Sequence, residues 1–268
     1  MAVTIRMKRL AFCFLIYDII HHEKLWSLFF KNIDSKKYSI YIHYKTQTKL
    51  AYFEKYKIKN CIQTNYDDFT IPLAYNILFR EAYRDKTNYK FIILSGACIP
   101  LKSFNFIYDK LTNDDYGYFN ISPSSQCFPN CNSLLDKIDT QYISKSHNWF
   151  ILNRNLVVNL CFDKDGILQT WYKDIYAPAE YFYYTYIKIL KCENEIHTTE
   201  NLPTATTFTN WADMDYIYRS DNGLKNYTSI SEEELLYLLN SPSLFGRKFT
   251  VECGSSLNNS FYSKLICS

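Results

Sequence analysis

The sequence contains little glycine and carries almost no net charge. Glycine accounts for 6 of its 268 residues. Neither a P-loop nor a G-x-G-x-x-G motif occurs, which disfavours nucleotide binding by a glycine-rich loop. The 30 Lys and Arg residues against 27 Asp and Glu residues leave a formal net charge of +3. Bulk binding of nucleic acid usually requires a clearly basic surface, so we expect no nucleic-acid partner.

The sequence also lacks a transmembrane run and a recognisable export signal. Its longest apolar run, 10–20, is interrupted by Asp18 and is shorter than the roughly 20 residues that cross a bilayer. No small-residue cleavage site follows this run, so we interpret it as a buried strand rather than a signal peptide. We therefore predict a cytoplasmic protein without a membrane span, whose nine cysteines are mostly reduced and buried.

The apolar residues are numerous and regularly spaced. They make up 47% of the chain, enough for a folded core. The predicted strands of the first half are 10–17, 38–44, 61–63 and 91–94, and the predicted helices are 23–32, 71–83 and 105–111. This alternation predicts an α/β fold, in which helices cover both faces of a mainly parallel sheet. No linker divides the chain, so we predict a single domain over residues 1–268.

Ligands of such sheets gather where the parallel strands end. The strand ends place Tyr17, His43 and Ser95 on the wall of a predicted pocket. Residues 113–147 are polar and rich in Ser, Asn, Asp and Pro, which predicts loops and short strands over a binding face. The later part of the chain predicts a strand over 149–152 and helices over 156–162, 181–190 and 232–240. Ser231 begins a capping box for the last of these helices.

Candidate metal ligands are present, but they do not form a specific site. Residues 163–165 (Asp-Lys-Asp) and 213–215 (Asp-Met-Asp) have the D-x-D spacing with which many sugar-nucleotide transferases hold Mn²⁺ or Mg²⁺. Neither pair follows an apolar strand, so we interpret both as acids of surface turns. The adjacent His21 and His22 would point to opposite sides of an extended segment, which disfavours a shared ion. We therefore predict no metal site.

Five longer strings occur in order along the chain. They are Leu94-Ser-Gly-Ala-Cys-Ile-Pro-Leu-Lys102, Lys145-Ser-His-Asn-Trp-Phe150, Tyr176-Ala-Pro-Ala-Glu-Tyr-Phe182, Asn210-Trp211 and Leu244-Phe-Gly-Arg-Lys-Phe249. Together they resemble the core-2/I-branching β-1,6-N-acetylglucosaminyltransferase family, which includes peptide O-xylosyltransferases. The resemblance runs from about Arg9 to about Lys248. The strings look most similar to those of the branch shared by plants and giant viruses.

The resemblance implies an inverting glycosyltransferase with a GT-A-like, Rossmann-like α/β fold. A nucleotide-sugar half would cover about 9–112 and an acceptor and catalytic half about 113–250, with a short tail over 251–268. It further implies a UDP-sugar donor, with N-acetylglucosamine as the expected sugar, an acceptor glycan or glycoprotein, and no metal or other cofactor. Eukaryotic members usually carry a membrane anchor and work in the Golgi, so we expect a viral or otherwise unanchored form.

The resemblance also assigns roles to individual residues. Glu180 matches the family's catalytic base, and Lys248 matches a lysine that binds the UDP diphosphate. Lys225 falls where mammalian members place an Arg for the same task, Arg247 is a further candidate cation, and Trp211 matches a tryptophan beside the acceptor sugar. These residue types suit the chemistry. Inverting transfer needs a carboxylate that takes the acceptor's proton and positive charge that balances the departing diphosphate.

Each assignment has an alternative that rests on the residues alone. At a helix N-terminus, Glu180 could be only a first-turn acid, and this position is expected to lower its pKa. The lysines could be solvated, and Trp211 could belong to the core.

The sequence also departs from the family at three positions. Ala179 replaces an acid next to the base, Cys98 replaces an Asp, and Lys45 stands where the family has an Asp that touches the nucleoside. These departures leave two alternatives open. One is a protein that binds carbohydrate or nucleotide sugar without catalysis, and the other is a sister enzyme that transfers xylose or another sugar.

Overall fold

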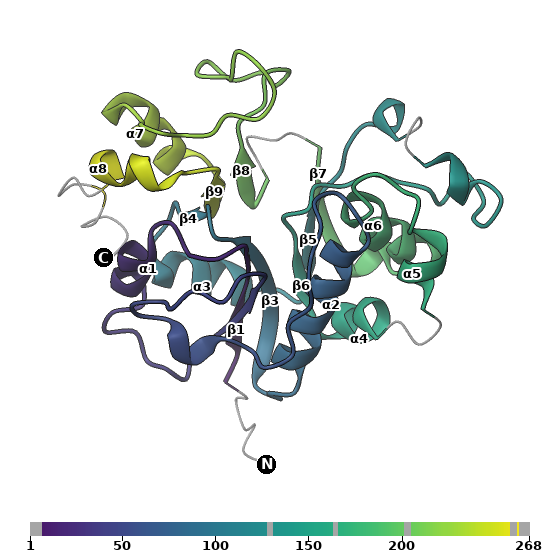
Figure 1. The fold of residues 1–268 in the computed structure, drawn as a ribbon, viewed down its shortest axis with the longest axis horizontal. Coiled ribbons are helices and arrows are strands. Elements are labelled where there is room, and N and C mark those ends of the chain that lie inside the picture. Colours follow the sequence, from purple (N-terminus) through teal and green to yellow (C-terminus); the bar gives the residue numbers. More distant parts are fainter. Residues whose placement is uncertain (1–6, 128–130, 163–165, 201–204, 258–261, 263–268) are drawn as a thin grey trace.

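The computed structural model describes residues 7–127, 131–162, 166–200, 205–257 and 262 (Figure 1). Within these residues the strands are β1 (Arg9–Ile16), β2 (Tyr38–Tyr44), β3 (Asn88–Ser95), β4 (Ile99–Pro100), β5 (Gly117–Asn120), β6 (Ile151–Asn153), β7 (Ile196–Thr199), β8 (Thr207–Thr209) and β9 (Phe245–Arg247). The helices are α1 (Glu23–Phe29), α2 (Thr70–Tyr83), α3 (Phe104–Thr112), α4 (Arg154–Cys161), α5 (Ile167–Trp171), α6 (Ala179–Ile189), α7 (Glu232–Asn240) and α8 (Gly254–Leu257). The α/β class predicted from the sequence is confirmed.

A six-stranded sheet in the order β2-β1-β3-β6-β5-β7 forms the centre of the fold. β1 pairs in parallel with β2 and β3, and β5 pairs in parallel with β7. β6 runs antiparallel to both of its neighbours, β3 and β5. Residues 10–14 of β1 are all 0% exposed, as expected for a central strand covered on both faces. The mainly parallel sheet is therefore confirmed.

Helices cover both faces of this sheet. On one face, the Phe12 ring packs against Trp26 of α1 and Phe104 of α3, with ring centroids 6.3 and 6.2 Å apart. On the other face, α2 packs on β1, β2 and β3 and contacts α4 and α6. There the Phe79 and Phe91 rings meet at 6.5 Å. Figure 1 shows α1 and α3 on one side of the sheet and α2, α4 and α6 on the other.

A smaller sheet in the order β4-β9-β8 lies beside the main sheet, together with α7 and α8 (Figure 1). Its hydrophobic cluster is separate from the main core and includes Tyr227, Leu238 and Phe249. The predicted capping box of α7 is confirmed, because the Ser231 hydroxyl accepts a hydrogen bond from the Glu234 backbone N–H at 3.1 Å. Since β4 follows β3 after a short turn and pairs with β9, this sheet brings the end of β9 to the carboxyl end of β3.

The loops that follow β1 and β3 are in close backbone contact at Gly96. A Cβ atom on this residue would lie 2.4 Å from the carbonyl oxygen of Ile19. The Gly96 carbonyl accepts a hydrogen bond from the His21 backbone N–H at 2.9 Å. Only glycine permits so close a backbone approach, and the contact fixes the two strand ends against each other.

One predicted strand is wrong. Residues 61–63 form a loop beside β2, where the Ile62 backbone N–H donates to His43 Nε2 at 3.0 Å. At this edge of β2, the described residues form an isolated bridge, between Ile42 and Lys57, in place of a ladder of paired residues. The predicted helices and the remaining predicted strands occur; the bounds of β2 and α7 are as predicted, and the others differ by a few residues.

Two further predictions concern membranes and cysteines. Among the described residues, no helix combines the length and the apolar content that crossing a membrane requires. Eight cysteines fall within the described ranges, and each is a free thiol. All of them except Cys61 and Cys192 are buried, in agreement with the predicted reduced and buried thiols.

Candidate active site

The first turn of α6 carries Glu180, the predicted base. Pro178 is the N-cap residue of this helix, and its fixed φ angle suits a helix start. The Ala177 carbonyl accepts a hydrogen bond from the Glu180 N–H at 2.9 Å, and Ala177 has a positive φ of 52°. The chain therefore turns sharply before the helix and leaves the Glu180 side chain 26% exposed.

The segment that begins at Lys145 holds the Glu180 carboxylate in place. The Lys145 ammonium forms an ion pair with Glu180 Oε2 at 3.2 Å, and the Asn148 amide donates to Oε1 at 3.5 Å. The Ser146 backbone N–H donates to the Glu180 carbonyl at 2.7 Å. Backbone and side chain of Glu180 are thus both tied to this segment, which follows the loops after β5.

Glu180 lines a cavity of about 580 Å³, a volume typical of small-molecule sites. The polar, charged and aromatic residues around it are Tyr66, Asp67, Ser122, Gln126, Lys145, Ser146, His147, Tyr176, Glu200, Trp211, Asp213 and Asp215. Three polar atoms of this lining, Asp67 Oδ2, Ser146 Oγ and Trp211 Nε1, are buried without a hydrogen-bond partner among the described residues. Buried polar atoms normally have partners, so this lining offers hydrogen-bonding groups that the described residues leave unused.

Burial has the largest effect on the pKa of Glu180. Burial raises the pKa of this carboxyl group, Lys145 lowers it, Asp67 raises it further and Arg247 lowers it. The expectation that the helix N-terminus would lower this pKa is wrong, because the cost of burying the carboxylate outweighs the attraction of the nearby cations. A raised pKa brings the group closer to the working pH of a general base.

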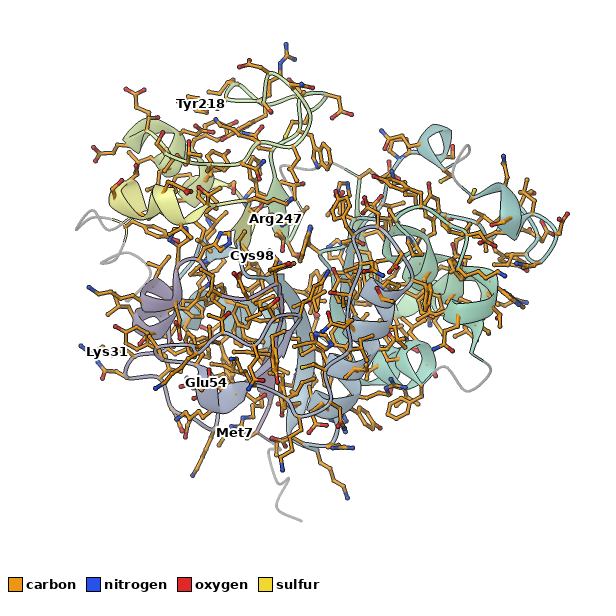
Figure 2. The ribbon with its side chains drawn as sticks, viewed as in Figure 1. Met7, Lys31, Glu54, Cys98, Tyr218 and Arg247 are labelled. Atoms are coloured by element: carbon orange, nitrogen blue, oxygen red, sulfur yellow. The ribbon has the colours of Figure 1, made fainter. Side chains whose placement is uncertain are left out.

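The end of β9 brings Arg247 to the carboxyl end of β3. Its guanidinium stacks on the Trp149 ring at 3.9 Å and acts electrostatically on the Cys98 thiol. Figure 2 shows Arg247 and Cys98 close together near the middle of the molecule. Arg247 is 9% exposed. Within the described part of the chain, its Nε has no hydrogen-bond partner and its guanidinium forms no ion pair with a carboxylate. Burial lowers the pKa of this guanidinium, yet arginine stays protonated.

Lys248 follows Arg247 and is half-buried. Burial and the charge of Arg247 lower the pKa of its ammonium, and Asp67 opposes this shift. Asp67 also acts electrostatically on Glu180. Arg247 and Lys248 do not themselves line the cavity of Glu180, but Asp67 does, so one carboxylate is near both the predicted base and the predicted lysine.

Lys225 is engaged elsewhere. Its ammonium lies 3.1 Å from both carboxylate oxygens of Glu234 and 4.6 Å from the centre of the Tyr227 ring. Glu234 is 6% exposed and also accepts a hydrogen bond from the Tyr227 hydroxyl at 2.8 Å. The charge of Lys225 is therefore satisfied within the smaller core, and its role at a diphosphate stays a prediction.

The three predicted wall residues differ in accessibility. Tyr17 is 65% exposed, with the Lys45 ammonium 5.3 Å from the centre of its ring. His43 is fully buried, and burial lowers its pKa to about 4. Ser95 Oγ lies 3.3 Å from Cys98 Sγ in the turn after β3. None of the three lines the cavity of Glu180, and their place on the wall of a ligand pocket stays a prediction.

The two D-x-D pairs are placed differently. Residues 163–165 lie outside the described residues. Asp213 and Asp215 are exposed in a turn, as predicted, but both line the cavity with Glu180. Within the described ranges, no three His, Cys, Asp or Glu side chains are grouped as a metal site requires. The absence of a metal from the reaction stays a prediction.

Sequence reasoning missed two residues of the cavity. Lys145 opens one of the five strings, but no role was assigned to it; its position in that string was the available signal. Asp67 belongs to no string and lies in the loop before α2, so nothing in its local sequence marked it. The structure does bring Glu180 and Trp211 to one cavity, as their predicted roles require.

The chain is similar to known proteins in two comparisons. Residues 10–237 match the Core-2/I-Branching enzyme family. Glycosyltransferase BC10 of Oryza sativa subsp. japonica is 23% identical over 154 residues, which cover 54% of this chain and 38% of the rice protein. The match therefore spans well under half of the length of that relative.

Proposed function

The chain belongs to the Core-2/I-branching family of glycosyltransferases, and we propose that it transfers a sugar from a UDP-sugar to a hydroxyl group of an acceptor glycan with inversion. Glu180 is the proposed base, and the reaction is proposed to need no metal. N-acetylglucosamine is the proposed sugar, because it is the sugar of the family that the five strings resemble.

In the proposed reaction, the acceptor hydroxyl gives its proton to a carboxylate oxygen of Glu180. The acceptor oxygen attacks the anomeric carbon from the face opposite the UDP group and forms the new C–O bond. The bond from that carbon to the β-phosphate oxygen breaks, and its electron pair leaves with UDP. The configuration at the anomeric carbon is inverted, and Glu180 later returns its proton to water.

The placement of Glu180 is the observation that carries this proposal. The carboxylate lines a cavity of small-molecule size and is held at 3.2 Å by Lys145. Burial keeps the group basic, while Lys145 favours the ionised form that a base must start from. A first-turn acid that only balanced the helix dipole would need neither a cavity nor a fixed cation.

Arg247 and Lys248 are the proposed cations for the departing UDP. An unpaired buried charge is costly unless an anion joins it, and Arg247 is buried without a carboxylate partner among the described residues. Fixed cations stabilise the charge that develops on a leaving diphosphate, a task that a metal ion performs in other enzymes. Lys225 could contribute only if the diphosphate competed with Glu234 for its ammonium.

A UDP-release assay tests the proposal. The protein is incubated with UDP-N-acetylglucosamine, UDP-xylose or UDP-glucose in EDTA without acceptor, and slow hydrolysis of one donor is expected. The Glu180→Gln variant is the control and should release UDP at the background rate. Turnover that EDTA abolishes and Mn²⁺ restores would contradict metal independence and would bring Asp213 and Asp215 into the mechanism.

The Lys145–Glu180 ion pair also favours a second candidate, a protein that binds nucleotide sugar without transferring it. A carboxylate paired with a cation takes up a proton less readily. UDP binding in calorimetry together with no release from any donor would support this candidate. Release that Glu180→Gln abolishes would exclude it, and release from UDP-xylose alone would identify a sister activity.

A further inference from the structure

We infer that Asp67 binds the transferred sugar and helps to select it, with its carboxylate accepting hydrogen bonds from hydroxyl or amide N–H groups of that sugar. The inference rests on the proposed function, because it places the sugar of the UDP donor in the cavity of Glu180. It adds a residue that no sequence string contains.

The backbone at Asp67 is unusual. Its φ of 55° lies in the left-handed region, which few non-glycine residues adopt. Its carbonyl accepts a hydrogen bond from the Ala177 N–H at 2.9 Å, and Ala177 also has a positive φ. This bond ties the loop before α2 to the turn that begins the helix of Glu180. Backbone outliers of this kind concentrate at ligand sites.

The Asp67 carboxylate lies in the wall of the cavity and has an oxygen without a partner among the described residues. Asp67 acts on Tyr66 and Tyr176, and its negative charge helps to raise the pKa of both hydroxyls. Oδ2 is buried without a partner among the described residues, and yet Asp67 lines the cavity. A buried carboxylate oxygen without a donor carries a desolvation cost, which a hydroxyl group of a ligand would offset.

The neighbours of Asp67 indicate which part of a ligand it meets. It acts electrostatically on Glu180 and on Lys248. In the proposed reaction, the transferred sugar lies between the base, which works beside its anomeric carbon, and the cations that hold the diphosphate. A carboxylate near both therefore faces the transferred sugar rather than the nucleoside.

Asp67 could instead act only on Glu180, as a like charge that raises the pKa of the base. The two roles predict different measurements. A sugar contact changes the affinity for UDP-sugar and leaves the affinity for UDP unchanged. A charge effect changes the pH profile and leaves both affinities unchanged.

The experiment compares Asp67→Asn and Asp67→Gly with the wild-type chain. Both replacements tolerate a positive φ, so the backbone turn is kept while the charge or the side chain is removed. Asp109→Asn is the control, since it removes one negative charge from an exposed position on α3. Calorimetry measures the affinities for UDP and for UDP-N-acetylglucosamine, and donor hydrolysis is followed against pH.

We expect both Asp67 variants to bind UDP within about twofold of the wild type. Their affinity for UDP-N-acetylglucosamine should fall by about 10-fold or more, the usual loss for a hydrogen bond to a charged group, and Asp109→Asn should behave as wild type. Unchanged affinity for UDP-N-acetylglucosamine in both variants would overturn the inference. This holds whether or not the acidic side of the pH–rate profile of donor hydrolysis shifts to lower pH. Wild-type protein that binds no UDP would instead contradict the proposed function, which is a separate result.

Discussion

The core of the main sheet and the cavity around Glu180 differ in how far the chain completes its own contacts. In the core, the Phe12 ring is 0% exposed and is surrounded by rings from α1 and α3. Around the cavity, Asp67 Oδ2, Ser146 Oγ and Trp211 Nε1 are buried without partners among the described residues. The contacts of the Phe12 ring are therefore made within the chain, whereas these three polar atoms of the cavity lining have no partner among the described residues.

This difference separates stability from function. Close packing in a core contributes to the free energy of unfolding, while unpartnered polar atoms lower it and are retained where a ligand completes them. Variants in the two regions should therefore fail in different assays, and each prediction below tests this separation.

Glu180→Gln should have the largest effect. Glutamine keeps the shape of the side chain but cannot take the acceptor's proton, so the transfer rate should fall on the order of 10²–10⁴-fold. UDP affinity and thermal stability should stay near those of the wild type. UDP release and a thermal melt measure the two properties, and loss of UDP binding in place of turnover would argue against a base.

Phe12→Ala tests the core side of the comparison. Removing this ring should lower the free energy of unfolding by about 3–5 kcal/mol, measured by urea denaturation, and should leave the KM for the donor unchanged. Phe106→Ala is the matched control, because Phe106 on α3 is 51% exposed and surface substitutions usually cost no more than about 0.5 kcal/mol. An altered KM for the donor in folded Phe12→Ala protein would contradict the view that the core contributes to stability and not to donor binding.

Lys248→Met and Lys225→Met compare two cations. Lys248 is proposed to bind the diphosphate of UDP, whereas Lys225 is already paired with Glu234. Lys248→Met should weaken UDP binding by about 10-fold or more. Lys225→Met should change UDP binding by less than about threefold but lower thermal stability, because it leaves Glu234 buried without its cation. The opposite pattern in calorimetry and melting would place the diphosphate at Lys225.

Acidification should destabilise the core through His43. Its pKa is about 4 in the folded chain against about 6.5 when unfolded. Between these values the unfolded chain takes up a proton that the folded chain does not, so stability is full above pH 6.5 and falls as the pH approaches 4. The contribution of His43 is up to about 1.4 kcal/mol per pH unit.

Urea denaturation at pH 7 and pH 5 measures this slope in the wild type and in His43→Gln. The variant should show a shallower slope, and the remainder should come from His22 and His147, whose pKa values are also lowered to about 4. An identical slope in the two proteins would contradict a neutral, buried His43.

Most of the fold could be predicted because it depends on local pattern. The apolar run in β1 and the alternation in β2 specify buried strands, and Ser231 marks the start of α7. The segment 61–63 could not be placed by the same reasoning. Whether so short a segment joins a sheet depends on whether it pairs with the edge of β2. That pairing is a tertiary contact, which the local sequence of 61–63 does not determine.

The site could be predicted only in part, because its contacts join distant segments. Glu180 and Trp211 were found through the strings. The pair of Lys145 with Glu180 and the approach of Asp67 to Lys248 depend on tertiary packing. Likewise, nothing in the local sequence shows that Glu234 engages Lys225.

The most direct test of the account is an experimental structure of the Glu180→Gln protein with UDP-N-acetylglucosamine bound. We expect the sugar between position 180 and Asp67, the diphosphate against Arg247 and Lys248, and Lys225 still paired with Glu234. A nucleotide bound in a different cavity, or a diphosphate held by Lys225 with the Glu234 contact broken, would contradict it.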